Sequence, residues 1–102
     1  EFVGCCSLIP QSDVYRINAE IGYWIGEQYW GNGYATEAVK QLVAIAFNQL
    51  GIHRVYAKIF EYNVASMRVL EKIGFEKEAI IKLSVIKEGR IFNEYIYSIM
   101  NI

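Results

Sequence analysis

A long helical pattern between two segments of alternating polarity is the feature that most constrains the fold of this chain. From about Gly33 to Leu50, apolar side chains recur at helical spacing and form a single stripe. Residues 19–25 before it and 52–60 after it alternate between apolar and polar side chains, as strands do. The order strand, helix, strand implies a right-handed crossover and parallel pairing of the two strands. We therefore expect a sheet with the helix packed against it.

The segments before residue 26 predict a hairpin. Residues 2–9 and 14–25 have the composition of strands, and the turn-forming residues 10–13 lie between them. Alternation along the second strand places one set of side chains on one face, Asn18, Glu20, Gly22 and Trp24, and the intervening set on the other.

The C-terminal part predicts a second helix and another hairpin. Asn63 resembles the N-cap of a helix from Val64 to Ile73, which Gly74 ends. Residues 75–87, with a possible break, and 90–100 have strand character, with a turn at residues 88–89. The predicted order is β-β-α-β-α-β-β, a mixed α/β sheet in one domain comprising residues 1–102.

Bulk composition excludes several classes of protein. The net charge of −1 gives no basic surface for nucleic acid. No apolar run approaches the roughly 18 residues that a membrane span requires, and no secretory signal is visible. Cys5 and Cys6 are adjacent, which strains a disulfide, and no Cys or His is spaced to bind zinc. We expect a cytoplasmic protein with reduced cysteines and no metal.

The segment from Gln28 to Thr36 has the character of a phosphate-binding loop. It reads Gln-Tyr-Trp-Gly-Asn-Gly-Tyr-Ala-Thr between a predicted strand and a predicted helix. Gly31 and Gly33 allow the backbone to approach a ligand closely, and the first amides of the helix favour an anion. Two glycines are also compatible with a plain turn. A P-loop requires a Lys after its last glycine, but this chain has Tyr34 there. A dinucleotide-binding fingerprint requires a Gly or Ala where this chain has Thr36, and an acidic residue about 20 residues further on. Both kinds of nucleotide-binding loop are therefore disfavoured.

Two motifs in this chain resemble those of the GNAT acetyltransferases. The segment from Glu20 to Ala38 resembles their acetyl-CoA-binding motif, Gln/Arg-x-x-Gly-x-Gly/Ala, with Gln28, Gly31 and Gly33 in its positions. Asn63-Val-Ala-Ser66, followed by Val69-Leu-Glu-Lys72 and Gly74-Phe75, resembles the second signature of the branch that contains the N-terminal acetyltransferases of ribosomal proteins. The resemblance covers nearly the whole chain from Val3 onward.

The resemblance implies an acetyl-CoA-dependent transfer to a primary amine, by direct attack in a ternary complex. Acetyl-CoA is the implied cosubstrate, and the acceptor is a protein N-terminus or a small-molecule amine. Backbone amides between Gln28 and Ala35 would hold the pyrophosphate. The residues implied in cofactor binding are Tyr23, Trp24, Ile25, Gln28, Gly31, Asn32, Gly33, Tyr34, Ala35 and Asn63. Tyr23 to Ile25 would line the pantetheine arm through their backbone where the strand splays from its neighbour, and Asn63 would both cap its helix and bind the pantetheine.

Glu20 and Ser66 are the candidate catalytic residues. Glu20 precedes the glycine loop on the central strand and is the candidate base, although a purely structural partner is an open alternative. Ser66 lies one helical turn after Asn63, and in this branch such a serine is proposed to donate to the CoA sulfur. Many family members carry a Tyr where this chain has Leu70. His53 is interpreted as structural. Tyr95 and Tyr97 could reach the acceptor groove, but aromatic residues in a terminal strand are more often part of the core.

The family fold has a strand and two helices before the first hairpin, and this sequence lacks them. We therefore expect the C-terminal part of a longer protein or a truncated copy, whose uncovered apolar surface favours self-association. The alternative function is an inactive or truncated module that binds CoA or a partner.

Overall fold

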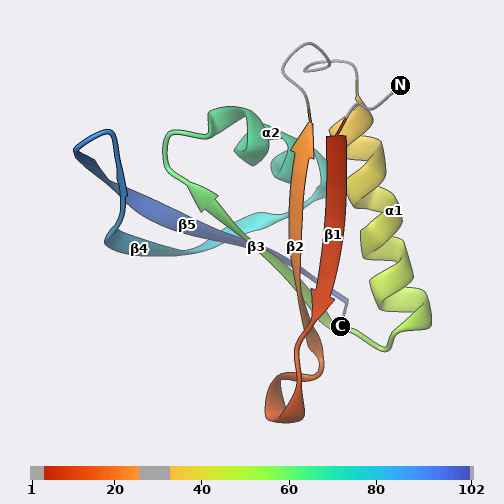
Figure 1. The fold of residues 1–102 in the computed structure, drawn as a ribbon. Helices are drawn as coiled ribbons and strands as arrows, with labels where there is room; N and C mark the ends of the chain where they lie inside the picture. Colours follow the sequence, from red (N-terminus) through yellow and green to blue (C-terminus); the bar gives the residue numbers. More distant parts are fainter. Residues whose placement is uncertain (1–3, 26–32, 102) are drawn as a thin grey trace.

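The computed structural model describes residues 4–25 and 33–101 of the chain. Its elements are β1 (Gly4–Pro10), the 3-10 helix η1 (Asp13–Tyr15), β2 (Asn18–Ile25), α1 (Tyr34–Gln49), β3 (Arg54–Phe60), α2 (Val64–Ile73), β4 (Glu76–Lys87) and β5 (Arg90–Met100). Figure 1 shows them coloured along the chain. With η1 set aside, the order is the predicted β-β-α-β-α-β-β, so the mixed α/β fold is confirmed.

The strands form a sheet in the order β1-β2-β3-β5-β4. β2 and β3 are parallel, and every other neighbouring pair is antiparallel. The helix α1 connects the two parallel strands, which confirms the predicted crossover.

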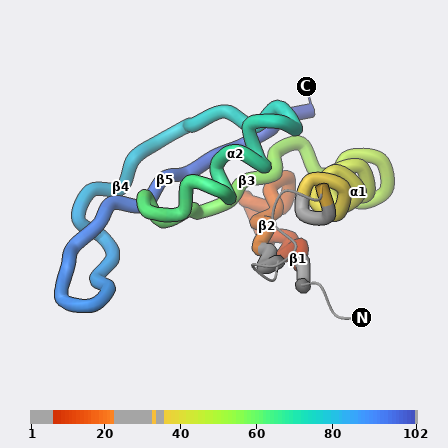
Figure 2. The backbone as a smooth tube through the Cα atoms, turned by 90° about the horizontal axis from the view of Figure 1, so that it is seen from above, coloured from red at the N-terminus to blue at the C-terminus, as the bar shows by residue number. Residues whose placement is uncertain are grey.

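Both helices cover the same face of the sheet. Ala19 and Ile21 on β2 are buried together with Val55 and Ala57 on β3, and Tyr97 on β5 lies opposite Ala57. The helical side chains in the same core are Val39, Val43 and Ala46 from α1 and Met67 and Leu70 from α2. Figure 2 shows the two helices next to each other. The predicted faces of β2 are confirmed for residues 18–21, since Ala19 and Ile21 are buried in this core while Asn18 and Glu20 point away from it and are only half-buried.

The opposite face of the sheet carries no helix within residues 4–25 and 33–101. Its side chains include Glu20, Arg54, Tyr56 and Ser98, which the strand register places side by side across β2, β3 and β5. We call this the open face.

The predicted strand from Val14 to Ile25 is wrong before Asn18. Asp13 to Tyr15 form a 3-10 turn in which Asp13 has a φ of 58°. The Asn18 side chain donates to the Tyr15 carbonyl oxygen at 3.1 Å and stabilises this turn. Val14 and Tyr15 are both strongly exposed, so their apolar character did not reflect burial in a strand. Pro10, predicted as turn, ends β1, where an edge strand tolerates its missing N–H.

The edge strand β4 contains the predicted break. Its register jumps from Ile81 opposite Glu94 to Val85 opposite Phe92, so three β4 residues face the single residue Asn93. Bulges of this kind, together with charged side chains, protect an exposed sheet edge from pairing with other chains.

Candidate active site

β2 and β3 separate from each other half-way along their length. Their paired residues are Asn18 with Arg54, Ala19 with Val55 and Glu20 with Tyr56. β2 then continues to Ile25, paired on its other side with β1, and β3 continues to Phe60, paired on its other side with β5. Figure 1 shows the two strands diverging. The result is a wedge between two halves of the sheet, open at the carboxyl ends of parallel strands, where α/β proteins commonly bind ligands.

One side of the wedge leads into the N-terminus of α1. Gly33 is the N-cap residue, with a φ of 81°, a left-handed conformation that strains any residue with a Cβ. The backbone amides of Tyr34 and Ala35 lie in the first turn of α1, where amides lack intrahelical partners and favour an anion. This arrangement fits a diphosphate group at the mouth of the wedge.

The predicted cofactor-binding residues that precede Gly33 divide into two groups. Tyr23, Trp24 and Ile25 form the end of β2, in the part that has separated from β3. Gln28, Gly31 and Asn32 lie outside the described residues, so their predicted roles stay predictions.

The N-terminus of α2 follows directly from the other side of the wedge. Asn63 Oδ1 accepts a hydrogen bond from the Ser66 backbone N–H at 3.3 Å, so Asn63 is the predicted N-cap. The cap uses the side-chain oxygen, and the side-chain NH2 group is the part of Asn63 that can donate to a ligand. Both predicted roles of Asn63 are therefore compatible. Ser66 is half-buried in the first turn of α2, as the spacing predicted.

Glu20 lies at the apex of the wedge, on the open face. It belongs to the last pair of β2 and β3, and its partner Tyr56 donates from Oη to Glu20 Oε1 at 3.5 Å, at the long limit for a hydrogen bond. Partial burial, followed by the nearby Glu20 carboxylate, raises the pKa of the Tyr56 phenol. Tyr56 therefore stays a neutral donor to the carboxylate at physiological pH. Tyr56 was not predicted as a site residue, although its spacing in the sequence places it on the same face of β3 as Arg54 and Lys58.

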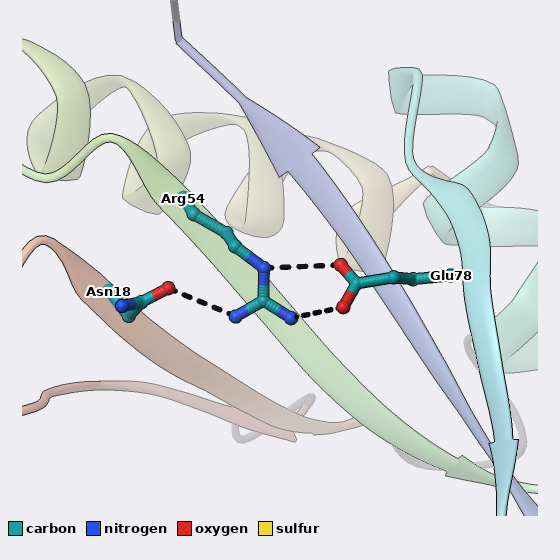
Figure 3. A network of polar contacts seen from close by, with 3 residues as sticks. All are labelled: Asn18, Arg54 and Glu78. Carbon is teal, nitrogen blue, oxygen red and sulfur yellow. Dashed lines mark hydrogen bonds and ion pairs between the residues drawn. The ribbon is translucent and has the colours of Figure 1, made fainter. Parts of the chain in front are cut away.

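A polar network joins three strands on the open face beside Tyr56 (Figure 3). The Arg54 guanidinium donates from Nε and Nη2 to both carboxylate oxygens of Glu78, at 3.1 and 2.8 Å, and from Nη1 to Asn18 Oδ1 at 3.0 Å. These bonds to Arg54, with a smaller contribution from Ser98, lower the pKa of Glu78. Arg54 also lies 4.7 Å from the centre of the Tyr56 ring. The network fixes Tyr56 and the apex of the wedge relative to β4.

The side chains predicted to be structural, those of His53, Tyr95 and Tyr97, make contacts of their own. His53 is exposed just before β3, with Nδ1 3.3 Å from the Asn101 carbonyl oxygen. Tyr97 is buried on the helix-covered face and donates to Glu71 Oε2 at 3.0 Å. Burial and this bond raise the pKa of Tyr97 to about 12. Tyr95 is half-buried beside the same core.

The described part of the chain has neither a candidate metal site nor a candidate membrane-spanning helix. No group of three or more His, Cys, Asp or Glu side chains there could hold a metal ion. None of the helices in that part has the length and apolar character to cross a membrane.

The comparisons with known proteins agree on the family. The model of the acetyltransferase (GNAT) domain matches residues 1–76. The uncharacterized N-acetyltransferase YoaA of Bacillus subtilis is 39% identical over 100 residues, which are 98% of this chain and 56% of YoaA. The "Putative ribosomal N-acetyltransferase YdaF" of the same organism is 32% identical, over 93% of this chain and 53% of YdaF. The structure of Mycobacterium smegmatis RimJ in complex with CoA-disulfide superimposes with a TM-score of 0.84 at 27% identity, over 98% of this chain and 48% of RimJ.

The chain therefore belongs to the GNAT acetyltransferase family, as the two motifs predicted. It spans about half the length of the curated relatives that it matches.

Proposed function

We propose that this chain binds acetyl-CoA in the wedge between β2 and β3 and transfers the acetyl group to a primary amine. The observation that carries the proposal is the wedge itself, bordered by the N-termini of α1 and α2. The two helix starts offer backbone and side-chain donors to one ligand that extends along the wedge, and a diphosphate joined to a polyamide arm fits that distribution of donors. Family membership supports acetyl-CoA as this ligand.

When bound, acetyl-CoA supplies a thioester whose carbonyl carbon the amine attacks, so that an amide bond forms and CoA leaves as the thiol. Gly33 and the first amides of α1 hold the diphosphate, and Asn63 donates from its side chain to the pantetheine arm. Glu20, at the apex of the wedge, takes the proton that the attacking amine loses, directly or through water. Tyr56 holds the Glu20 carboxylate in place by donating to it. Ser66, in the first turn of α2, donates to the leaving sulfur in this proposal.

The acceptor is a protein N-terminus of the ribosomal-protein kind, with a small-molecule amine as the alternative. The name of YdaF, which is 32% identical to this chain, supports the first choice. The test is the release of free CoA when the chain is incubated with acetyl-CoA and a panel of N-terminal peptides and small amines. Release no faster than without protein would contradict the proposal.

The alternative is a module that binds CoA without turnover. The donors at the two helix starts account for binding of CoA, and binding by itself does not require turnover. Calorimetric titration with acetyl-CoA distinguishes the two functions, because binding without CoA release on any acceptor supports the module.

A further inference from the structure

Glu61 connects the end of β3 to β5 through both its backbone and its side chain. The Glu61 N–H donates to the Asn93 carbonyl oxygen at 3.1 Å, and Glu61 Oε1 accepts from the Asn93 N–H at 2.7 Å. In a regular ladder a backbone carbonyl would accept the second bond. The carboxylate replaces it at the point where the chain leaves the sheet, and bonds to a charged acceptor are among the stronger ones.

Asn93 is itself fixed by the bulge of β4. Its Oδ1 accepts from the Leu83 N–H at 2.9 Å, and Leu83 has a φ of 54°, which leucine rarely adopts. Such strained residues persist where the surrounding structure holds them. Asn93 thus links Glu61 to the bulge of the β4–β5 hairpin, where the Leu83 conformation is held by its bond to Asn93.

The chain between Glu61 and Asn63 has little freedom to move. The Asn63 N–H donates to the Phe60 carbonyl oxygen at 2.9 Å and closes a tight turn. Within this turn the Tyr62 ring lies edge-on to Phe92, with 4.8 Å between the ring centres. The position of Asn63 beside the wedge therefore depends on where Glu61 is held.

We infer that Glu61, anchored by Asn93, is a positioning residue that places the Asn63 side chain for acetyl-CoA. This inference rests on the proposed function of Asn63. Glu61 acts only through Asn63, and it takes no part in the chemistry.

The test compares Glu61→Ala and Glu61→Gln with the control Glu76→Ala. Glu76 is exposed at the first residue of β4, away from the bulge that holds Asn93. We expect Glu61→Ala to weaken acetyl-CoA binding by roughly tenfold, the loss expected when the Asn63 donor no longer reaches the ligand. Glu61→Gln retains an oxygen that accepts from Asn93 and should restore most of the affinity. Glu76→Ala should leave the affinity unchanged.

A double-mutant cycle with Asn63→Asp separates positioning from general destabilisation. Asn63→Asp retains the capping oxygen and removes the NH2 donor, so adding Glu61→Ala should cost little further affinity. Full additivity of the two changes would overturn the inference, as would an affinity of Glu61→Ala equal to that of the unaltered chain.

Hydrogen exchange of the Asn63 backbone amide gives a readout that is independent of acetyl-CoA. We expect faster exchange in Glu61→Ala, because the turn that this amide closes is no longer anchored. Unchanged exchange would refute the positioning role. Failure of the unaltered chain to bind acetyl-CoA would instead refute the proposed function.

Discussion

Tyr56 Oη lies 3.5 Å from Glu20 Oε1, and this contact joins the last paired residues of β2 and β3 before the strands separate. The carboxylate proposed as the base thus sits where the two halves of the sheet meet. Its hydrogen-bond partner comes from the half that also carries Asn63.

Replacing Glu20 by Gln should lower kcat by about 100-fold, a typical loss for a general base, while the Kd for acetyl-CoA stays constant. Tyr56→Phe should lower kcat only a few fold, because it removes a positioning bond. Since the pKa of Tyr56 is raised, its ionisation should not reduce the rate below about pH 10. Steady-state rates and calorimetry of both variants check this, with Glu76→Gln, at an exposed position of β4, as control. An unchanged kcat in Glu20→Gln would exclude it as the base.

Asn63→Asp should weaken acetyl-CoA binding about tenfold without lowering the melting temperature. Asp is as good an N-cap as Asn, so α2 keeps its start, while the donor to the ligand is lost. Asn63→Ala should lower both quantities, because the bond to the Ser66 N–H is lost as well. Calorimetry and thermal unfolding measure the two effects. Equal affinities for Asn63→Asp and the unaltered chain would show that Asn63 is a cap only.

Gly33 and Gly51 offer a matched pair at the two ends of α1. Both have a positive φ, 81° and 67°, and a Cβ at either one would have no atom of the described residues within 4 Å. Replacement by Ala should therefore cost about 1 kcal/mol of unfolding free energy at each position, from backbone strain alone. Only Gly33→Ala should also weaken binding of acetyl-CoA, which calorimetry will detect. A comparable loss of affinity in Gly51→Ala would argue against a ligand at the start of α1.

Tyr97 should make the fold less stable at alkaline pH. Its pKa is about 12 when folded and near 10 when unfolded, so its contribution is fully present below pH 10 and is lost as the pH rises toward 12. The unfolding free energy should fall by about 2 kcal/mol over this interval. Tyr97→Phe should remove much of this fall, although at pH 7 it costs about 1 kcal/mol through the lost bond to Glu71. Urea unfolding at pH 7, 10 and 12 tests this, and an equal fall in the variant would contradict it.

Glu78 should act in the opposite direction at acidic pH. Hydrogen bonds from Arg54 lower its pKa below the usual 4.5, so its stabilising contribution is present above pH 4.5 and is lost as the pH falls through the folded value. Glu78→Gln should therefore show a smaller loss of stability on acidification. Arg54→Lys should behave similarly, because Lys cannot form the two parallel bonds. The exposed Arg68→Lys on α2 serves as control for urea unfolding at pH 3 and 7.

The helices and strands of this fold could be predicted from the sequence because they depend on the local pattern of residues. Val64 and Ile73 bound α2 as predicted, since Asn63 and Gly74 carry the local chemistry of helix ends. The strand predicted from Val14 failed, because exposed apolar residues in a turn have the same composition as a strand.

The pairing of side chains in the site could not be predicted from the sequence. Tyr56 and Glu20 are 36 residues apart, as are Arg54 and Asn18, and Glu61 and Asn93 are 32 residues apart. These pairs depend on the register between strands, which local pattern does not fix. The family motifs led to Glu20, Asn63 and Ser66 as candidates without indicating what holds them in place.

The three residue pairs that join β2 to β3 also bear on the cooperativity of folding. Beyond them, the β1–β2 hairpin is held to the other strands mainly through the core beneath α1. Weakly joined parts of a protein can open separately, at a lower free energy than global unfolding. A ligand that spans the wedge would bind only when both parts of the sheet are in place, so its binding would stabilise their association. Amide protection along β1 and β2 should consequently rise on saturation with ligand more than protection along β5.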